Sequence, residues 1–235
     1  DGRAVGRGQG VGAEVSRYDL IIFDYDGVVA DSELLNNRVL AELLTECGLE
    51  TGLDEALSTY MGKRWLDCLP LIERRMGGPC PEHFHGEWTR RCHDRAAVEL
   101  NPVPGFVEFL AARRESRCIA SSSPVPWIEM GLERFGVAAA FGGSIFSAAV
   151  HVARGKPHPD LFLHAASAMA VDPARALVIE DTPTGVRAGV AAGMTVVGLC
   201  AGGHIRDGHA DRLDAAGAHH VVQDYAGVAA LIEAG

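Results

Sequence analysis

Residues 18–27 of the 235-residue chain read YDLIIFDYDG, and this stretch decides the fold. Its first six residues form the short apolar run that is typical of a strand buried on both faces of a parallel sheet. The run ends abruptly at Asp24, where an Asp-Tyr-Asp-Gly sequence begins. Four further runs of strand length follow, at residues 117–120, 176–179, 195–199 and 220–222.

Helical patterns lie between these runs, at residues 125–135, 159–169, 184–192 and 212–216. Strands that alternate with helices predict an α/β fold, here a Rossmann-like core in which helices flank a mostly parallel sheet. The alternation breaks at residues 33–103, where we find helical stretches at 34–47 and 65–76 but no convincing strand. We therefore predict a helical cap domain at 33–103, inserted after the first strand, and a core formed by 17–32 and 104–235.

Composition excludes several classes of protein. The formal net charge of −10 argues against a nucleic-acid partner, which would require a concentrated basic face. No apolar run approaches the roughly 18 residues of a membrane span. The six cysteines form no CxxC pair, which favours reduced thiols and a cytoplasmic location. Residues 1–16 contain five glycines and no apolar signal segment, and we expect a flexible leader there.

Charged and hydroxyl side chains follow the apolar runs, where ligands bind in open α/β sheets. Asp24 and Asp26 follow the first run, serines 121–123 follow the second, and Glu180 and Asp181 follow the run at 176–179. Four clustered carboxylates raise one another's pKa values and need compensation. A divalent cation that prefers oxygen ligands, Mg²⁺, would supply it.

Lys156, in the sequence Gly155-Lys156-Pro157, belongs to the same set. Only two of the 21 basic residues are lysines, Lys63 and Lys156, although genomic composition explains the arginine bias itself. Each feature also has a structural explanation: an Asp-Gly turn ends many strands, Asp181 or Ser121 could cap a helix, and Lys156 could be a solvated loop charge. Their order along the chain, each near a strand end, favours a shared site.

Four motifs carry a resemblance to a known family. They lie at residues 23–33 (FDYDGVVADSE), 119–123 (IASSS), 155–160 (GKPHPD) and 178–182 (VIEDT). In this order they resemble the haloacid dehalogenase-like hydrolase superfamily, over residues 18 to about 232. Its capped phosphatases, including 6-phosphogluconate phosphatase, and its β-phosphoglucomutase-like members are the most similar.

The resemblance implies a Mg²⁺-dependent phosphomonoesterase that acts on a small sugar phosphate or sugar-acid phosphate. Asp24 would be the nucleophile and form an aspartyl-phosphate, and Asp26 would be the general acid and base. The carboxylates of Asp24 and Asp181 and the backbone carbonyl of Asp26 would bind Mg²⁺, with Glu180 at or near the ion. The residues expected to hold the phosphoryl oxygens are Ser121, Ser122 and Lys156. We expect a monomer or weak homodimer.

Three alternative functions differ from a phosphatase in the residues that they require. A haloacid dehalogenase needs neither an acid for the leaving group nor a metal, so Asp26 and the Glu180-Asp181 pair favour a phosphatase. A phosphosugar mutase of the β-phosphoglucomutase type carries a cap histidine twelve residues after the nucleophile, where this chain has Asn36. A non-catalytic phosphate sensor would have no need of the intact set of charged residues.

Two clusters in the predicted cap are further candidates. Lys63, Arg64 and Trp65 match the cap loop that reads the substrate in related proteins; the alternative is a helix start with a solvated basic turn and a core tryptophan. Five cysteines and histidines crowd into residues 80–93, but their spacing matches no common structural zinc site. We expect substrate contacts from the first cluster and no metal at the second.

Overall fold

A six-stranded sheet forms the centre of the computed structural model, which describes residues 17–61 and 65–234. All neighbouring strands are parallel, in the order β3-β2-β1-β4-β5-β6. The strands are β1 (Leu20–Phe23), β2 (Ser116–Ser121), β3 (Ile145–Ser147), β4 (Ala176–Glu180), β5 (Thr195–Leu199) and β6 (His220–Val222). The predicted parallel α/β fold is confirmed, and the apolar run after Tyr18 supplies the strand between β2 and β4.

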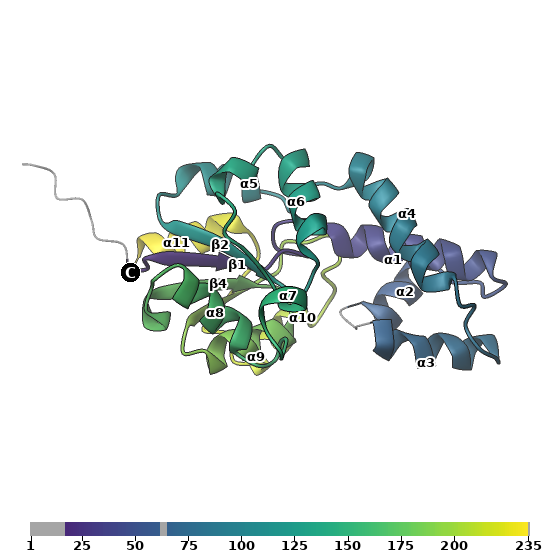
Figure 1. Cartoon of the computed structure of the whole chain (residues 1–235). Helices are drawn as coiled ribbons and strands as arrows, with labels where there is room; N and C mark the ends of the chain where they lie inside the picture. Colours follow the sequence, from purple (N-terminus) through teal and green to yellow (C-terminus); the bar gives the residue numbers. More distant parts are fainter. Residues whose placement is uncertain (1–16, 62–64, 235) are drawn as a thin grey trace, which may run out of the picture.

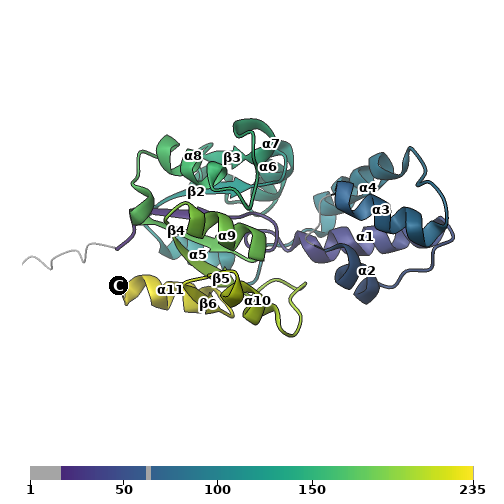
Figure 2. The same ribbon diagram turned by 90° about the horizontal axis from the view of Figure 1, so that it is seen from below.

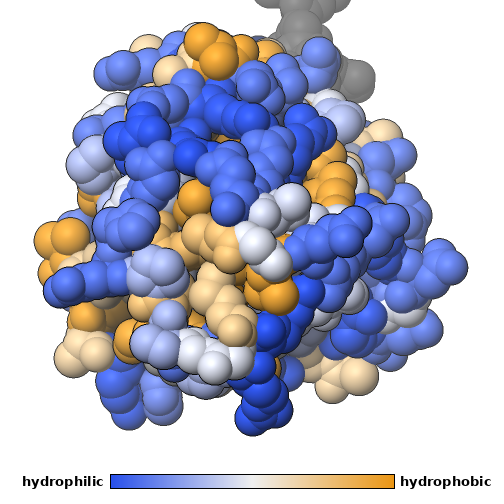
Figure 3. Space-filling view, turned by 90° about the vertical axis from the view of Figure 1, so that its right-hand side faces the viewer, coloured by the Kyte–Doolittle hydropathy of each residue, from blue (hydrophilic) through white to orange (hydrophobic). Residues whose placement is uncertain are grey.

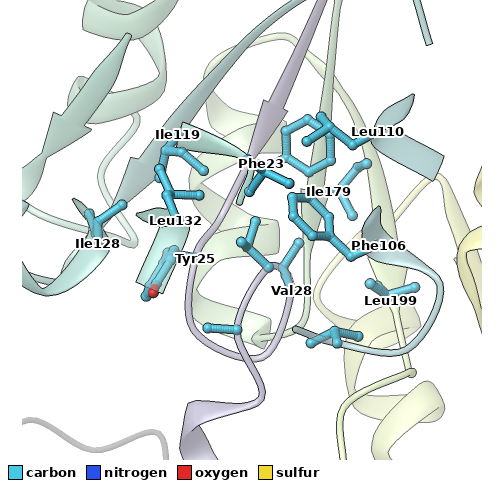
Figure 4. Packing of buried hydrophobic residues seen from close by; sticks show 14 of the residues in the cluster. Phe23, Tyr25, Val28, Phe106, Leu110, Ile119, Ile128, Leu132, Ile179 and Leu199 are labelled. Carbon is cyan, nitrogen blue, oxygen red and sulfur yellow. The ribbon is translucent and has the colours of Figure 1, made fainter. Parts of the chain in front are cut away.

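Helices cover both faces of the sheet because alternate residues of β1 point in opposite directions. Leu20 and Ile22 pack with α8 (Asp160–Ala168), α9 (Pro183–Ala191) and α10 (His209–Ala215). Ile21 and Phe23 pack with α5 (Phe106–Ala112), α6 (Val125–Arg134) and α11 (Tyr225–Glu233). Figure 4 shows part of this second cluster, where Phe23 and Ile179 of the sheet lie against side chains of α5. Both apolar faces of the sheet are therefore buried.

Four helices lie between β1 and the core helix α5: α1 (Ser32–Glu46), α2 (Leu53–Tyr60), α3 (Trp65–Met76) and α4 (Phe84–Glu99). They form a body of their own beside the core, at the end toward which β1 points (Figures 1 and 2). This body, called the cap below, has a separate apolar cluster that includes Leu44, Ile72 and Phe84. Residues of α1 and α4 also join the core cluster. The division into folding units at residues 33 and 103 stays a prediction.

The predicted elements differ from the observed ones mainly where sequence patterns are short. Strand β3 was not predicted, because three residues at the sheet edge are too few to show a period. The same holds for the single-turn helix α7 (Ala148–His151) and for the 3₁₀ turns at Ala138–Ala140 and Pro173–Arg175. Helix α11 was also missed, since its many small residues dilute the apolar pattern. Helix α10 begins three residues before the predicted start.

The surface is mainly polar. Figure 3, which views the molecule from the cap end, shows a hydrophilic face with apolar side chains scattered over it. Leu66 and Val98, on cap helices α3 and α4, are among the exposed apolar residues. None of the helices in the described part of the chain has the length and apolar character that crossing a bilayer demands.

Candidate active site

The predicted catalytic residues meet at the carboxyl end of the sheet. Asp24 directly follows β1, and its backbone N–H donates to Ile179 O of β4 at 3.0 Å, so both central strands end together. Tyr25 points into the core beneath the sheet (Figure 4), which leaves Asp24 and Asp26 on the opposite side of the chain. The Asp-Tyr-Asp spacing therefore places two carboxylates in one site and anchors the loop between them.

Lys156 connects two of the predicted carboxylates. Its Nζ donates to Asp24 Oδ1 at 2.7 Å and to Glu180 Oε1 at 2.6 Å. All three side chains are buried, with Lys156 only 7% exposed. Burial disfavours the charged lysine, but Asp24 and Glu180 outweigh this effect and raise its pKa above the ordinary value. Lys156 is thus a fixed cation and not a solvated loop charge.

Asp24, Glu180 and Asp181 form a group that could hold a metal ion, with one ligand atom of each lying within 4.8 Å of the others. Both carboxylate oxygens of Asp181 are buried and accept no hydrogen bond from residues 17–61 and 65–234. Burial raises the pKa of Asp24 to about 6 and the pKa of Asp181 well above its ordinary value, and the neighbouring carboxylates add to both. Buried carboxylates in this state are stabilised by a cation, so the donor set fits the hard divalent ion predicted from the sequence.

Asp26 lies apart from this group and has its own donors. Its Oδ1 accepts from Ser32 Oγ at 2.5 Å and from Trp127 Nε1 at 3.1 Å, and its Oδ2 accepts from Ser123 Oγ. Burial nevertheless raises the pKa of Asp26, with the three donors acting in the opposite direction. Sequence reasoning missed these donors, although Ser32 and Ser123 lie inside two of the motifs.

The predicted phosphate-binding serines separate in the structure. Ser121 is buried at the end of β2, and its Oγ accepts from the backbone N–H of Ser123 at 3.2 Å. Ser122 is exposed. The structure therefore places Ser121 at the carboxyl end of β2, next to the end of β1 that Asp24 follows, whereas Ser123 donates to Asp26. Their roles toward phosphate stay predictions.

Two histidines that sequence reasoning missed surround Asp181. His204 Nε2 lies 2.9 Å from Asp181 Oδ2, outside hydrogen-bonding geometry, and His209 Nε2 lies 2.6 Å from the backbone oxygen of Asp181. Arg212 donates to His209 Nδ1 at 3.0 Å. Burial lowers the pKa of both histidines. Their position in the sequence could have indicated them, since both follow β5 and the carboxyl end of β5 lies at the same edge of the sheet.

The loop after Asp26 depends on a glycine. Gly27 has φ +79°, and a Cβ atom there would lie 1.8 Å from Asp181 Oδ2 and 2.8 Å from His204 Cε1. Glycine adopts this left-handed conformation without strain, and it lacks the Cβ atom that would overlap the Asp181 carboxylate. Gly27 thus permits the close approach of the first and fourth motifs.

We predict that Gly27→Ala destabilises the protein by about 3 kcal/mol or more, because backbone strain and a clash with Asp181 add together. Gly48→Ala is the matched control: its φ is +85°, but no heavy atom of the described residues lies within 4 Å of the new Cβ. It should cost only the backbone strain of about 1–2 kcal/mol. Chemical denaturation of both variants measures the difference, and equal losses would contradict the proposed clash.

The predicted cap residues fall into two parts. Lys63 and Arg64 lie outside the described residues. Trp65 stacks on Phe84, His85 and Trp88 with ring centroids 5.9, 4.5 and 5.8 Å apart, which makes it a packing residue of the cap. The structure gives it no place in the site, so a direct substrate contact from Trp65 stays a prediction.

The fold is a parallel α/β core, and the site places an aspartate directly after the first strand in contact with a buried lysine. A family model for haloacid dehalogenase-like hydrolases matches residues 18–193. The chain belongs to this family, and the resemblance seen in its four motifs is confirmed.

Solved structures and a curated relative agree with this assignment. A haloacid dehalogenase-like protein from Agrobacterium tumefaciens is 34% identical, with a TM-score of 0.85 over 92% of this chain and 98% of that one. A hydrolase of the same family from Deinococcus radiodurans, solved with phosphate and sodium, is 33% identical, with a TM-score of 0.80 over 94% and 97%. The 6-phosphogluconate phosphatase of Escherichia coli is 26% identical over 81% of this chain and 86% of its own.

Proposed function

We propose that this enzyme is a Mg²⁺-dependent phosphomonoesterase that acts on a small phosphorylated metabolite through an aspartyl-phosphate. One observation carries the proposal: in a buried site, Lys156 bridges Asp24 and Glu180 beside the Asp181 carboxylate, which accepts no hydrogen bond from the described residues. Phosphoryl transfer requires a positioned nucleophile and neutralisation of charge, and this cluster provides both. The Deinococcus relative with bound phosphate supports the same reaction class.

The chain's own residues supply each step. Lys156 holds Asp24 through Oδ1, which orients the carboxylate for in-line attack on phosphorus. Asp26, whose pKa is raised by burial, protonates the leaving oxygen and then takes a proton from the hydrolytic water. Asp24, Asp181 and the Asp26 backbone carbonyl would hold Mg²⁺, with Glu180 at or near it. Bound there, Mg²⁺ would neutralise charge on the phosphoryl oxygens.

Hydrolysis is favoured over the mutase alternative by the residue at position 36. Asn36 lines a cavity that also contains Ser123 and Trp127, two of the three donors to Asp26. An amide at this place cannot shuttle a proton near neutral pH. A dehalogenase would leave the metal group and the acid at Asp26 without a role.

The test is phosphate release from a panel of sugar phosphates and sugar-acid phosphates, each with Mg²⁺ and with EDTA. We expect release that requires Mg²⁺. Conversion of a hexose 1-phosphate to its isomer without free phosphate would instead establish the mutase. The cytoplasmic location and the monomeric or weakly dimeric state stay predictions, and size-exclusion chromatography with light scattering measures the latter.

We predict that Asp181→Asn removes the stabilisation that Mg²⁺ gives to the parent protein. Saturating Mg²⁺, at 100 times its Kd, should stabilise the parent by about 2.7 kcal/mol. In EDTA the variant should be at least as stable as the parent, because it no longer buries a charged group without a hydrogen bond. Thermal denaturation with and without Mg²⁺ checks both statements. The control is Asp214→Asn on the exposed face of α10, which should respond to Mg²⁺ like the parent.

A further inference from the structure

A second feature of the site is a pocket of about 300 Å³ between the cap and the core. Asn36 of α1 and Trp88 and His93 of α4 line its cap side, and Ser123 and Trp127 line its core side. This set is called the aromatic pocket below. Its volume is in the range of small-molecule sites.

The aromatic pocket opens beside Asp26. Two of its lining residues, Ser123 and Trp127, are the residues that donate to the Asp26 carboxylate from the core. A group whose oxygen receives a proton from Asp26 must lie within hydrogen-bond reach of that carboxylate. The pocket is therefore placed to hold the leaving group of the substrate and not its phosphoryl group, which belongs beside Lys156.

Four aromatic residues line the pocket: His85, Trp88, His93 and Trp127. His93 meets Trp127 edge to face, with ring centroids 5.0 Å apart. Trp88 donates its indole N–H to Asn36 O at 3.2 Å, so its polar group is already satisfied, and its ring stacks on Trp65 while also lining the pocket. The C–H faces of a sugar ring or polyol chain are apolar surfaces that such rings bury well.

Asn36 adds a polar contact. Its Oδ1 is buried and accepts no hydrogen bond in the structure. A buried acceptor without a partner costs free energy that a hydroxyl donor from a ligand would recover. Asn36 is thus suited to a hydroxyl group.

The aromatic pocket differs in the charge of its lining residues from the larger cavity of about 790 Å³ on the Asp181 side of the site. No lysine, arginine, aspartate or glutamate occurs among the described residues that line the aromatic pocket. The larger cavity contains charges of both signs: Glu33, Asp54 and Asp181 with Arg206 and Arg212. An additional carboxylate or phosphate on a leaving group in the aromatic pocket would lose its hydration without meeting a cationic side chain among the described lining residues.

We propose that the aromatic pocket selects an uncharged, polyhydroxylated leaving group, so that the substrate is the monophosphate of a neutral sugar or polyol. The inference rests on the phosphomonoesterase activity proposed above and narrows its substrate class. Sugar-acid phosphates and bisphosphates are then poor substrates. Asn36, Trp88 and His93 are the residues that determine this specificity.

The test compares kcat/KM for a hexose monophosphate and a hexitol monophosphate with kcat/KM for 6-phosphogluconate, fructose 1,6-bisphosphate and acetyl phosphate. Acetyl phosphate has a leaving group too small to reach Trp88. We expect the better neutral substrate to exceed both anionic ones by at least about tenfold. Trp88→Leu and Asn36→Leu should each lower kcat/KM for that substrate about tenfold and change hydrolysis of acetyl phosphate less than about twofold.

His93→Ala and His83→Ala form a matched pair of exposed cap histidines, of which only His93 lines the pocket. His93→Ala should lower kcat/KM for the neutral substrate, and His83→Ala should not. A preference for 6-phosphogluconate or the bisphosphate, or equal losses on acetyl phosphate in folded Trp88→Leu and Asn36→Leu, would overturn the inference while the phosphatase activity stands. Absence of phosphate release from every ester would overturn both.

Discussion

Asp24→Asn should abolish phosphate release, with a fall in kcat of about 10⁴-fold or more, and leave the protein folded. Asparagine has nearly the shape of aspartate but cannot attack phosphorus to form the acyl phosphate. The fold should persist because the amide oxygen of asparagine can still accept from Lys156, which keeps its ion pair with Glu180, and because burial already disfavours the charged form of Asp24. We expect the melting temperature to stay within about 4 °C of the parent, which corresponds to about 1 kcal/mol.

The measurement is single-turnover phosphate release together with circular dichroism melting. Asp19→Asn is the matched control, since Asp19 precedes the same strand at its other end and pairs with Arg175 at the surface. It should keep full activity. Hydrolysis by Asp24→Asn at a rate near that of the parent would exclude the covalent mechanism.

Lys156→Met should reduce both activity and stability. It removes two buried ion pairs and leaves Asp24 and Glu180 close together without their common cation. Breaking a buried pair on one side costs about 3–5 kcal/mol, which lowers the melting temperature by about 10 °C. Loss of a cation at the phosphoryl group should lower kcat by about 10³-fold.

Thermal melting in EDTA and steady-state kinetics in Mg²⁺ measure the two effects. The control is Arg154→Met, a cation two residues earlier whose ion pair with Asp160 is 61% exposed on the arginine side. Exposed pairs contribute about 0–1 kcal/mol, so this variant should resemble the parent. If Lys156→Met also resembled the parent, the bridging role of Lys156 would be wrong.

The core of the site could be predicted because local sequence and topology are coupled in a parallel sheet. The end of an apolar run shows where a strand ends, and the carboxyl ends of all strands in a parallel sheet lie at the same edge. Asp24, Ser121 and Glu180 are therefore brought together by any sequence that forms these strands. Lys156 follows no predicted strand, and only the family resemblance and its rarity among the basic residues indicated its place.

The partners of Asp26 and Asp181 could not be predicted in this way. Trp127 lies on a helix 101 residues after Asp26, and its indole reaches the carboxylate only because α6 packs on the sheet beside β1. His204 reaches Asp181 from the loop after β5, and His209 reaches it from the first residue of α10. Trp65, which was predicted to contact substrate together with Lys63 and Arg64, stacks on His85 and Trp88 in the cap, and its substrate contact stays a prediction.

The sequence by itself determined the parallel α/β fold, the family and the set of charged residues at the sheet edge, since these depend on strand-length patterns and short motifs. Only the tertiary structure decided which side chains satisfy those charges and what surrounds the leaving group. Hydrogen-bond partners and pocket walls come from elements far apart in the chain, and their contacts depend on packing angles that no local pattern encodes.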